Sequence, residues 1–135
     1  MRVLAVDYGE RRTGLAVSDE MGITAQGLKT LEPEDESEIP ELVARTAQDK
    51  GVEIIVVGLP LNMDGTESEK SKKVREFGAL LAEKASLPVV FRDERMTSLQ
   101  AHRVMHEMNK KPGKNKPMVD RISATLILQE YLKTI

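Results

Sequence analysis

The sequence predicts an α/β fold built on a mixed five-stranded sheet, with the first three strands antiparallel and helices on both faces. The first part of the chain holds three short strand-like runs separated by turns, which favours an antiparallel meander. Two helix–strand units follow, and such units build parallel strands covered by helices. The chain has 135 residues, enough to bury one core, so we expect residues 1–135 to form a single domain.

The first three strands are predicted close to the N-terminus. Residues 2–6 form an apolar run that ends in Asp7, and both of its faces are apolar, as in a central strand covered on both sides. The polar turn that follows contains Gly9, and a second strand is expected at Gly14–Ser18. Residues 23–31 mix apolar and polar side chains, which is typical of a strand near the sheet edge.

A helix and a buried strand should come next. Ser37 can cap a helix that has Pro40 in its first turn, where proline is tolerated, and Gly51 marks its end. Residues 53–58 include four consecutive β-branched residues and predict the fourth strand.

The remaining elements follow from apolar periodicity. Residues 68–85 have apolar side chains at three- and four-residue spacings, which indicates an amphipathic helix. Residues 88–91 predict the fifth strand. Thr97 can cap a helix that runs to about residue 108, and the last helix begins near Pro117 and reaches the C-terminus.

Composition excludes several classes of protein. The hydrophobic fraction is 40%, the charged fraction 31% and the net charge -2, as in globular domains that fold in water. No apolar run is long enough to cross a bilayer, and an acid interrupts the position of a signal peptide, so we expect a cytoplasmic protein that does not bind membranes. The absence of cysteine excludes disulfides and cysteine nucleophiles. His102 and His106 lack an HExxH pattern, and we interpret them as surface or packing residues.

Acidic residues fall where an α/β sheet binds its ligands. Asp7 follows the first strand, Asp93 and Glu94 follow the last strand, and Asp120 lies in the first turn of the last helix. The strands before Asp7 and Glu94 should be parallel neighbours, and ligands bind beyond the carboxyl ends of such strands. Each acid alone is explained as a surface or helix-dipole charge. Three of them at one edge favour a functional site.

Carboxylates that converge in this way need positive partners. Two of them about 4 Å apart repel by roughly 4 kcal/mol at an effective dielectric near 20, so the cluster must bind cations or hold protons. Oxygen ligands without histidine or cysteine favour Mg²⁺ or Mn²⁺ over zinc. Two such ions can support phosphodiester cleavage. We therefore predict that Asp7, Glu94 and Asp120 are both the metal ligands and the catalytic residues.

Positive charge is segregated from the acidic stretch at residues 32–41, which can leave a basic face on an acidic protein. Arginine beside an acid cluster can hold phosphate in a bidentate manner, and lysines can contact a nucleic-acid backbone. The predicted substrate-binding residues are Arg95, Lys110, Lys111, Lys114 and Lys116. A solvated loop is the simpler interpretation of the lysines. Arg121 suits either phosphate binding or simple neutralisation of the neighbouring acids. An aromatic content of 3% argues against base stacking as the main mode of binding.

Two turns keep alternative interpretations. Gly9, Thr13 and Gly14 suit either close approach of backbone to a phosphate or an ordinary hairpin turn. The loop that follows the fourth strand contains Asp64-Gly65, and it either lines the crevice or forms a simple turn.

Four sequence blocks carry a resemblance to a known family. VDYGERRTGLAVSD, VVGLPLNMDG, DERMTS and VDRISATLILQEYL resemble, in order and across essentially the whole chain, the signature blocks of the YqgF family. That family is related in fold to the RuvC Holliday-junction resolvases. The resemblance implies an RNase H-like fold and a nuclease role. The acids of the first, third and fourth blocks correspond to Asp7, Glu94 and Asp120.

The sequence departs from the RuvC pattern at two places. RuvC-type enzymes have an acid at the end of the fourth strand, where this sequence has Gly58, so Glu94 on the next strand must substitute for it. They also have a second acid on the last helix, where this sequence has Ala124, whose small side chain would let the helix pack close to the strand carrying Asp7. Asp93 is a candidate fourth carboxylate, although adjacent strand residues point in opposite directions.

The favoured hypothesis is a metal-dependent endonuclease, a monomer or homodimer, that uses Mg²⁺ or Mn²⁺ on structured RNA. The resemblance implies that it processes the 5′ end of pre-16S rRNA during ribosome biogenesis. One alternative keeps the enzyme but has branched, four-way DNA as its substrate. Another is a non-catalytic RNA-binding assembly factor. A phosphotransferase of the actin and hexokinase type is disfavoured, because those proteins need two such domains.

Overall fold

The computed structural model describes residues 1–95 and 97–135, whose strands form a five-stranded sheet in the order β3-β2-β1-β4-β5. β1 (Val3–Asp7), β2 (Gly14–Ser18) and β3 (Ala25–Gly27) are an antiparallel meander. β4 (Ile54–Leu59) and β5 (Val89–Asp93) run parallel to β1. The predicted mixed sheet is confirmed. Met96, in the DERMTS block, lies outside the described residues.

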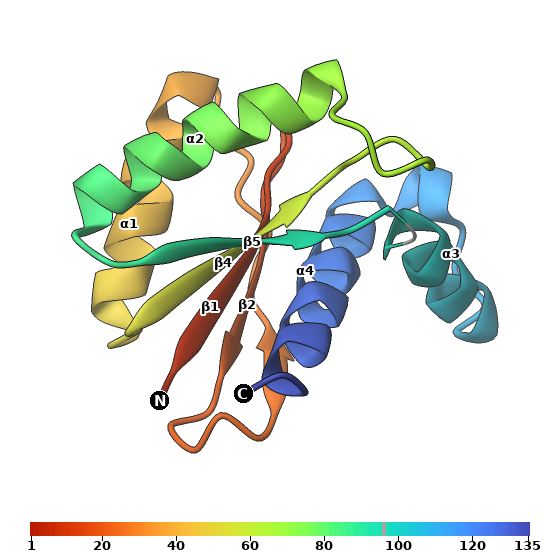
Figure 1. The fold of residues 1–135 in the computed structure, drawn as a ribbon. Coiled ribbons are helices and arrows are strands. Elements are labelled where there is room, and N and C mark those ends of the chain that lie inside the picture. The colour runs from red at the N-terminus through yellow and green to blue at the C-terminus, as the bar shows by residue number, and fades with distance from the viewer. Residues whose placement is uncertain (96) are drawn as a thin grey trace.

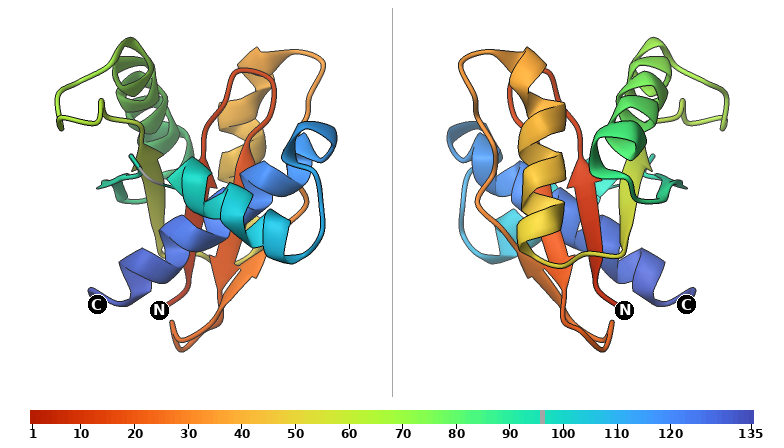
Figure 2. Two further views of the ribbon diagram at one scale, coloured as in Figure 1. Left: turned by 90° about the vertical axis from the view of Figure 1, so that its right-hand side faces the viewer. Right: turned by 90° about the vertical axis from the view of Figure 1, so that its left-hand side faces the viewer.

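Helices cover both faces of this sheet, as predicted. α1 (Ile39–Asp49) and α2 (Glu69–Ala85) lie on one face, and α4 (Lys116–Leu132) crosses the other (Figure 1). α3 (Thr97–Glu107) packs against the outer side of α4, as the two side views show (Figure 2). None of the helices in the described parts of the chain is both long and apolar enough to span a membrane.

The central strand supplies both cores. Leu4 and Val6 point toward α1 and α2, where they join a cluster that includes Phe77. Val3 and Ala5 point the other way, into a cluster formed with α4. The four β1 residues are 0% exposed, which accounts for the apolar character of both faces of this run.

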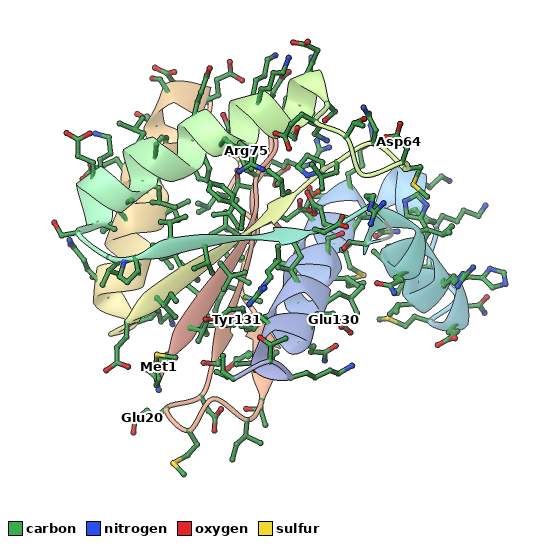
Figure 3. The ribbon with its side chains drawn as sticks, in the orientation of Figure 1. Met1, Glu20, Asp64, Arg75, Glu130 and Tyr131 are labelled. Carbon is green, nitrogen blue, oxygen red and sulfur yellow. The ribbon has the colours of Figure 1, made fainter. Side chains whose placement is uncertain are left out.

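Side chains at the sheet edge connect the layers. The Arg75 guanidinium extends from α2 over the ring of Phe91 in β5, 5.4 Å from its centroid. On the opposite face, the Arg92 guanidinium lies 5.0 Å from the ring centroid of Tyr131 in α4. Figure 3 shows Arg75 and Tyr131 on their two helices, on either side of β5. Two cation–π contacts thus hold β5 between the helical layers.

Two predicted boundaries are wrong. The third strand is only Ala25–Gly27, because the Asp19 carboxylate accepts the backbone N–H groups of Ile23 and Thr24 and turns that segment away from the ladder. Ser37 does not cap a helix. The Asp35 side chain instead caps a short 3-10 turn at Glu36–Glu38, and α1 begins after it.

Candidate active site

The three predicted acids line one pocket, of about 190 Å³. Asp7 is the last residue of β1, and Glu94 directly follows β5. Asp120 is the fifth residue of α4 and lies just beyond the first turn, where it was predicted, because the helix begins at Lys116. β4 lies between β1 and β5 and runs parallel to both. The side chains of Lys70, Arg95 and Ser123 line the same pocket, and of these only Arg95 was predicted. The structure therefore brings together acids that are more than 110 residues apart in the chain, as Asp7 and Asp120 are.

Glu94 occupies space that Gly58 leaves open. A Cβ atom on Gly58 would lie 2.7 Å from Glu94 Oε2 and 2.5 Å from Ile127 Cδ1. Gly58 is near the carboxyl end of β4, which carries no acid. The carboxyl group of Glu94 thus lies over that position from the neighbouring strand. This contact gives a steric reason for glycine at position 58 of the fourth strand.

A second close approach brings Asp120 to Asp7. Gly14 pairs with Asp7 across the β1–β2 ladder, and a Cβ on Gly14 would overlap the backbone carbonyl of Asp120. The backbone of α4 therefore lies directly on β2. From the sequence alone, Gly14 is expected to serve either a hairpin turn or the close approach of a phosphate to the backbone. Its role is to admit the helix, and Ala124 meets the sheet in the same core as Ala5.

Asp120 already has a positive partner. Arg12 Nε donates a hydrogen bond to Asp120 Oδ2 at 3.0 Å, and the two side chains are 28% and 23% exposed. Sequence reasoning missed this arginine, because 108 residues separate the pair and only the packing of α4 on β2 joins them.

A single shared proton balances the other two acids, Asp7 and Glu94. Burial first, and then the charge of Asp120, raise the pKa of Asp7 to about 6. Burial, the charge of Asp7 and a hydrogen bond to Asp7 raise the pKa of Glu94 to about 9. Near neutral pH the carboxyl group of Glu94 therefore stays protonated and donates a hydrogen bond to the Asp7 carboxylate. Burial also raises the pKa of Asp120, against the hydrogen bond and charge of Arg12.

The donor set fits a hard divalent cation. The pocket offers three carboxyl groups and a serine hydroxyl, which are oxygen ligands of the kind that Mg²⁺ and Mn²⁺ prefer. Within residues 1–95 and 97–135, no three acidic or histidine side chains are already close enough to form a metal site. A cation would have to replace two things that now balance the acids, the shared proton of Glu94 and the guanidinium of Arg12.

Asp93 and Arg95 pair with each other. Arg95 Nε donates to Asp93 Oδ2 at 2.7 Å, and Arg95 Nη1 donates to the backbone oxygen of Met63 at 3.0 Å. Asp93 is therefore paired with Arg95 and is not one of the residues that line the acid pocket.

The predicted lysines lie apart from the acids. All four are exposed, around the short 3-10 turn at Pro112–Lys114 and the start of α4. Lys114 lines a separate cleft of about 410 Å³ with Lys29 and Arg121. Arg121 belongs to this cleft and not to the acid pocket. The lysines in question are Lys110, Lys111, Lys114 and Lys116.

Comparison with protein families gives a match along nearly the whole chain. The family model described as RuvX, Holliday junction resolvase, matches residues 1–134. A protein of Clostridium novyi named "Putative pre-16S rRNA nuclease" is 44% identical over 135 residues, which is 100% of both chains. A protein of Koribacter versatilis with the same name is 46% identical over 132 residues, covering 98% of this chain and 86% of its own.

Solved structures show the same fold at low sequence identity. RuvC of Thermus thermophilus, bound to a Holliday junction substrate, has a TM-score of 0.60 and 18% identity, covering 99% of this chain and 96% of its own. The fowlpox virus resolvase in its Holliday junction complex has a TM-score of 0.63 and 14% identity, covering 99% of this chain and 98% of its own. The RNase H-like fold implied by the four sequence blocks is confirmed.

Proposed function

Because the chain belongs to the RuvX family, whose relatives in the comparison are named as nucleases, we propose that it is a metal-dependent endonuclease that hydrolyses phosphodiester bonds. The observation that carries this proposal is the convergence of Asp7, Glu94 and Asp120 on one pocket. These three carboxyl groups are its proposed metal ligands and catalytic residues.

The residues of the pocket have separable roles in this proposal. Bound Mg²⁺ or Mn²⁺ would polarise the phosphate and lower the pKa of a water molecule. Asp7 and Asp120 would hold the cations from opposite sides of the pocket, one from the sheet and one from the helix. Glu94 would give up its proton as a cation takes the place of that proton. The fixed strand ends keep Asp7 and Glu94 in place without loop closure.

The proposed substrate is the 5′ region of pre-16S rRNA, which would place the protein in the cytoplasm during ribosome biogenesis. The names of the relatives support this choice. A four-way DNA junction is the second candidate, supported by the description of the family model. Contacts to phosphate alone do not distinguish the two.

Cleavage of both substrates by matched variants tests the proposal. We expect the wild-type protein to cut a 5′-extended pre-16S rRNA fragment in Mn²⁺ or Mg²⁺. Asp7→Asn should lower the rate by roughly 100-fold or more, the range for removing one electrostatic interaction with a transition state. Asp49→Asn is the matched control, because this exposed acid at the end of α1 does not line the pocket, and it should retain cleavage.

Each other outcome has a distinct meaning. Equal cleavage by Asp7→Asn and wild type would contradict the proposed catalytic site. Faster cleavage of a four-way junction than of the rRNA fragment would favour the second substrate. RNA binding with neither cleavage nor metal binding, measured by calorimetry, would favour the non-catalytic assembly factor.

A further inference from the structure

A groove larger than the acid pocket lies beside it. It has a volume of about 540 Å³ and runs between the β1–β2 turn and the beginning of α2. Tyr8, Gly9, Lys70 and Asp120 line both the groove and the acid pocket, so the two spaces are adjacent. We propose that this groove binds a backbone phosphate of the substrate strand next to the bond that is cut. This inference rests on the proposed nuclease function.

The salt bridges of the groove leave two of its positive side chains without a direct partner. Lys73 Nζ lies 3.1 Å from Glu10 Oε1, and Arg12 is held by Asp120. Glu69, also in the groove wall, pairs with a lysine outside it, Lys72 at 3.6 Å. Among the residues that the structure describes, Arg11 and Lys70 line the groove and have no ion-pair partner. A phosphodiester would give both side chains a direct anionic partner.

Lys70 lies where the groove meets the acid pocket. Its charge lowers the pKa of all three acids, opposing the effect of their burial. It therefore acts on the same space as the carboxyl groups while its side chain also lines the groove. A phosphate bound at Lys70 and Arg11 would be adjacent to the phosphate at the acids.

Both walls of the groove are fixed. On one side, the ring of Tyr8 stacks on Phe77 with centroids 4.1 Å apart and planes 12° apart. On the other side, Ser68 caps α2 and its hydroxyl donates to the backbone oxygen of Pro60 at 2.7 Å. A preformed site loses less conformational entropy when it binds. The volume is within the range of pockets that hold a ligand of nucleotide size.

Binding experiments with charge-neutralising variants test this assignment. In the cleavage-deficient Asp7→Asn background with Mg²⁺, we would measure fluorescence anisotropy of a labelled pre-16S RNA fragment and a labelled four-way DNA junction over a salt series. Arg11→Gln and Lys70→Gln should each weaken binding of both probes several-fold. Each should also reduce the slope of log K against log salt by about 1, because each variant neutralises one phosphate fewer.

Lys84→Gln is the matched control. Lys84 is an exposed lysine on the same helix, pairs with Glu41 and lines neither space, so its replacement should leave affinity and salt slope unchanged. Three results would overturn the inference. They are equal binding by the groove variants and Lys84→Gln, weaker binding without a change in slope, and no binding of either probe. The cleavage test of the wild-type protein is separate, so failure of the nuclease proposal can be recognised independently.

Discussion

The position of the Glu94 side chain depends on Gly58, the neighbouring residue without a side chain. The carboxyl group of Glu94 lies where any side chain on Gly58 would stand, and the end of Ile127 closes the same space from α4. Neither the glutamate nor the isoleucine can retreat far, because one is held by Asp7 and the other belongs to a buried core. Gly58 therefore positions a proposed catalytic residue without touching substrate.

Gly58→Ala should displace Glu94 and overpack this contact. We expect the free energy of unfolding to fall by about 1–3 kcal/mol, the usual cost of an added methyl in a packed interior. The cleavage rate should fall by more than the decrease in the fraction of folded protein accounts for. Gly113→Ala is the control, because a Cβ there meets nothing within 4 Å. Wild-type cleavage by folded Gly58→Ala would show that the position of Glu94 is not critical.

The titration of Asp7 and Glu94 predicts how stability depends on pH. Their folded-state pKa values, about 6 and about 9, exceed the ordinary values of 3.8 and 4.5. The folded protein therefore binds more protons than the unfolded chain over this range. The stabilisation is complete below the ordinary values and is lost as pH rises through the folded-state values.

We expect the free energy of unfolding of the metal-free protein to fall as pH rises from about 4 to about 9. Urea denaturation in EDTA across this range measures it. Glu94→Gln should flatten the alkaline part of the profile, because glutamine has no proton to lose. Mn²⁺ should restore stability at the alkaline end, since it takes the place of the released protons. A profile independent of pH would contradict the shared-proton arrangement.

At the scale of elements, the beginning of α2 connects the fold to the proposed site. Ser68 caps the helix in a reciprocal box with Ser71, and its hydroxyl also contacts Pro60 at the end of β4. Ser68 thus ties the first turn of α2, which carries Lys70, to the chain that leaves β4. By contrast, Ser37 is exposed and caps no helix.

Ser68→Ala should lower the free energy of unfolding by about 1–2 kcal/mol, as the removal of an N-cap does. Ser37→Ala is the matched control and should cost no more than about 0.5 kcal/mol, the range for surface positions. Chemical denaturation of both variants gives the comparison. Equal destabilisation would mean that Ser37 contributes to a helix start in solution.

At the scale of the molecule, α4 separates two basic regions. The groove of Arg11 and Lys70 adjoins the acid pocket, whereas Lys114 lines a different cleft with Arg121. Asp120 and Arg121 are adjacent on α4 but line different spaces. A long substrate that crossed this helix could contact both regions.

Changing the four loop lysines together to glutamine tests whether the substrate extends that far. We expect weaker binding of the pre-16S RNA fragment and a salt slope reduced by about 1 for each phosphate that a lysine no longer neutralises. The cleavage rate at saturating substrate should stay unchanged, because these lysines lie outside the acid pocket. An unchanged salt slope would mean that they form only a solvated loop. The four residues are Lys110, Lys111, Lys114 and Lys116.

The sequence by itself determined the order and kind of most elements and the edge at which the acids meet. Apolar runs predicted β1, β2 and β4, because a strand that is buried on both faces consists almost entirely of apolar residues. The parallel direction of β1, β4 and β5 then followed from the helices between them. Asp7 and Glu94 could therefore be assigned to one edge of the sheet from the sequence alone.

Only the tertiary structure decided what balances and positions those acids. Arg12 meets Asp120, and Glu94 lies over Gly58, through contacts that depend on how closely α4 and β5 approach the sheet. Lys70 reaches the pocket for the same reason, from the helix on the other face. Periodicity reports which face of an element is apolar. It does not report the distance between elements, and that distance sets which charges meet.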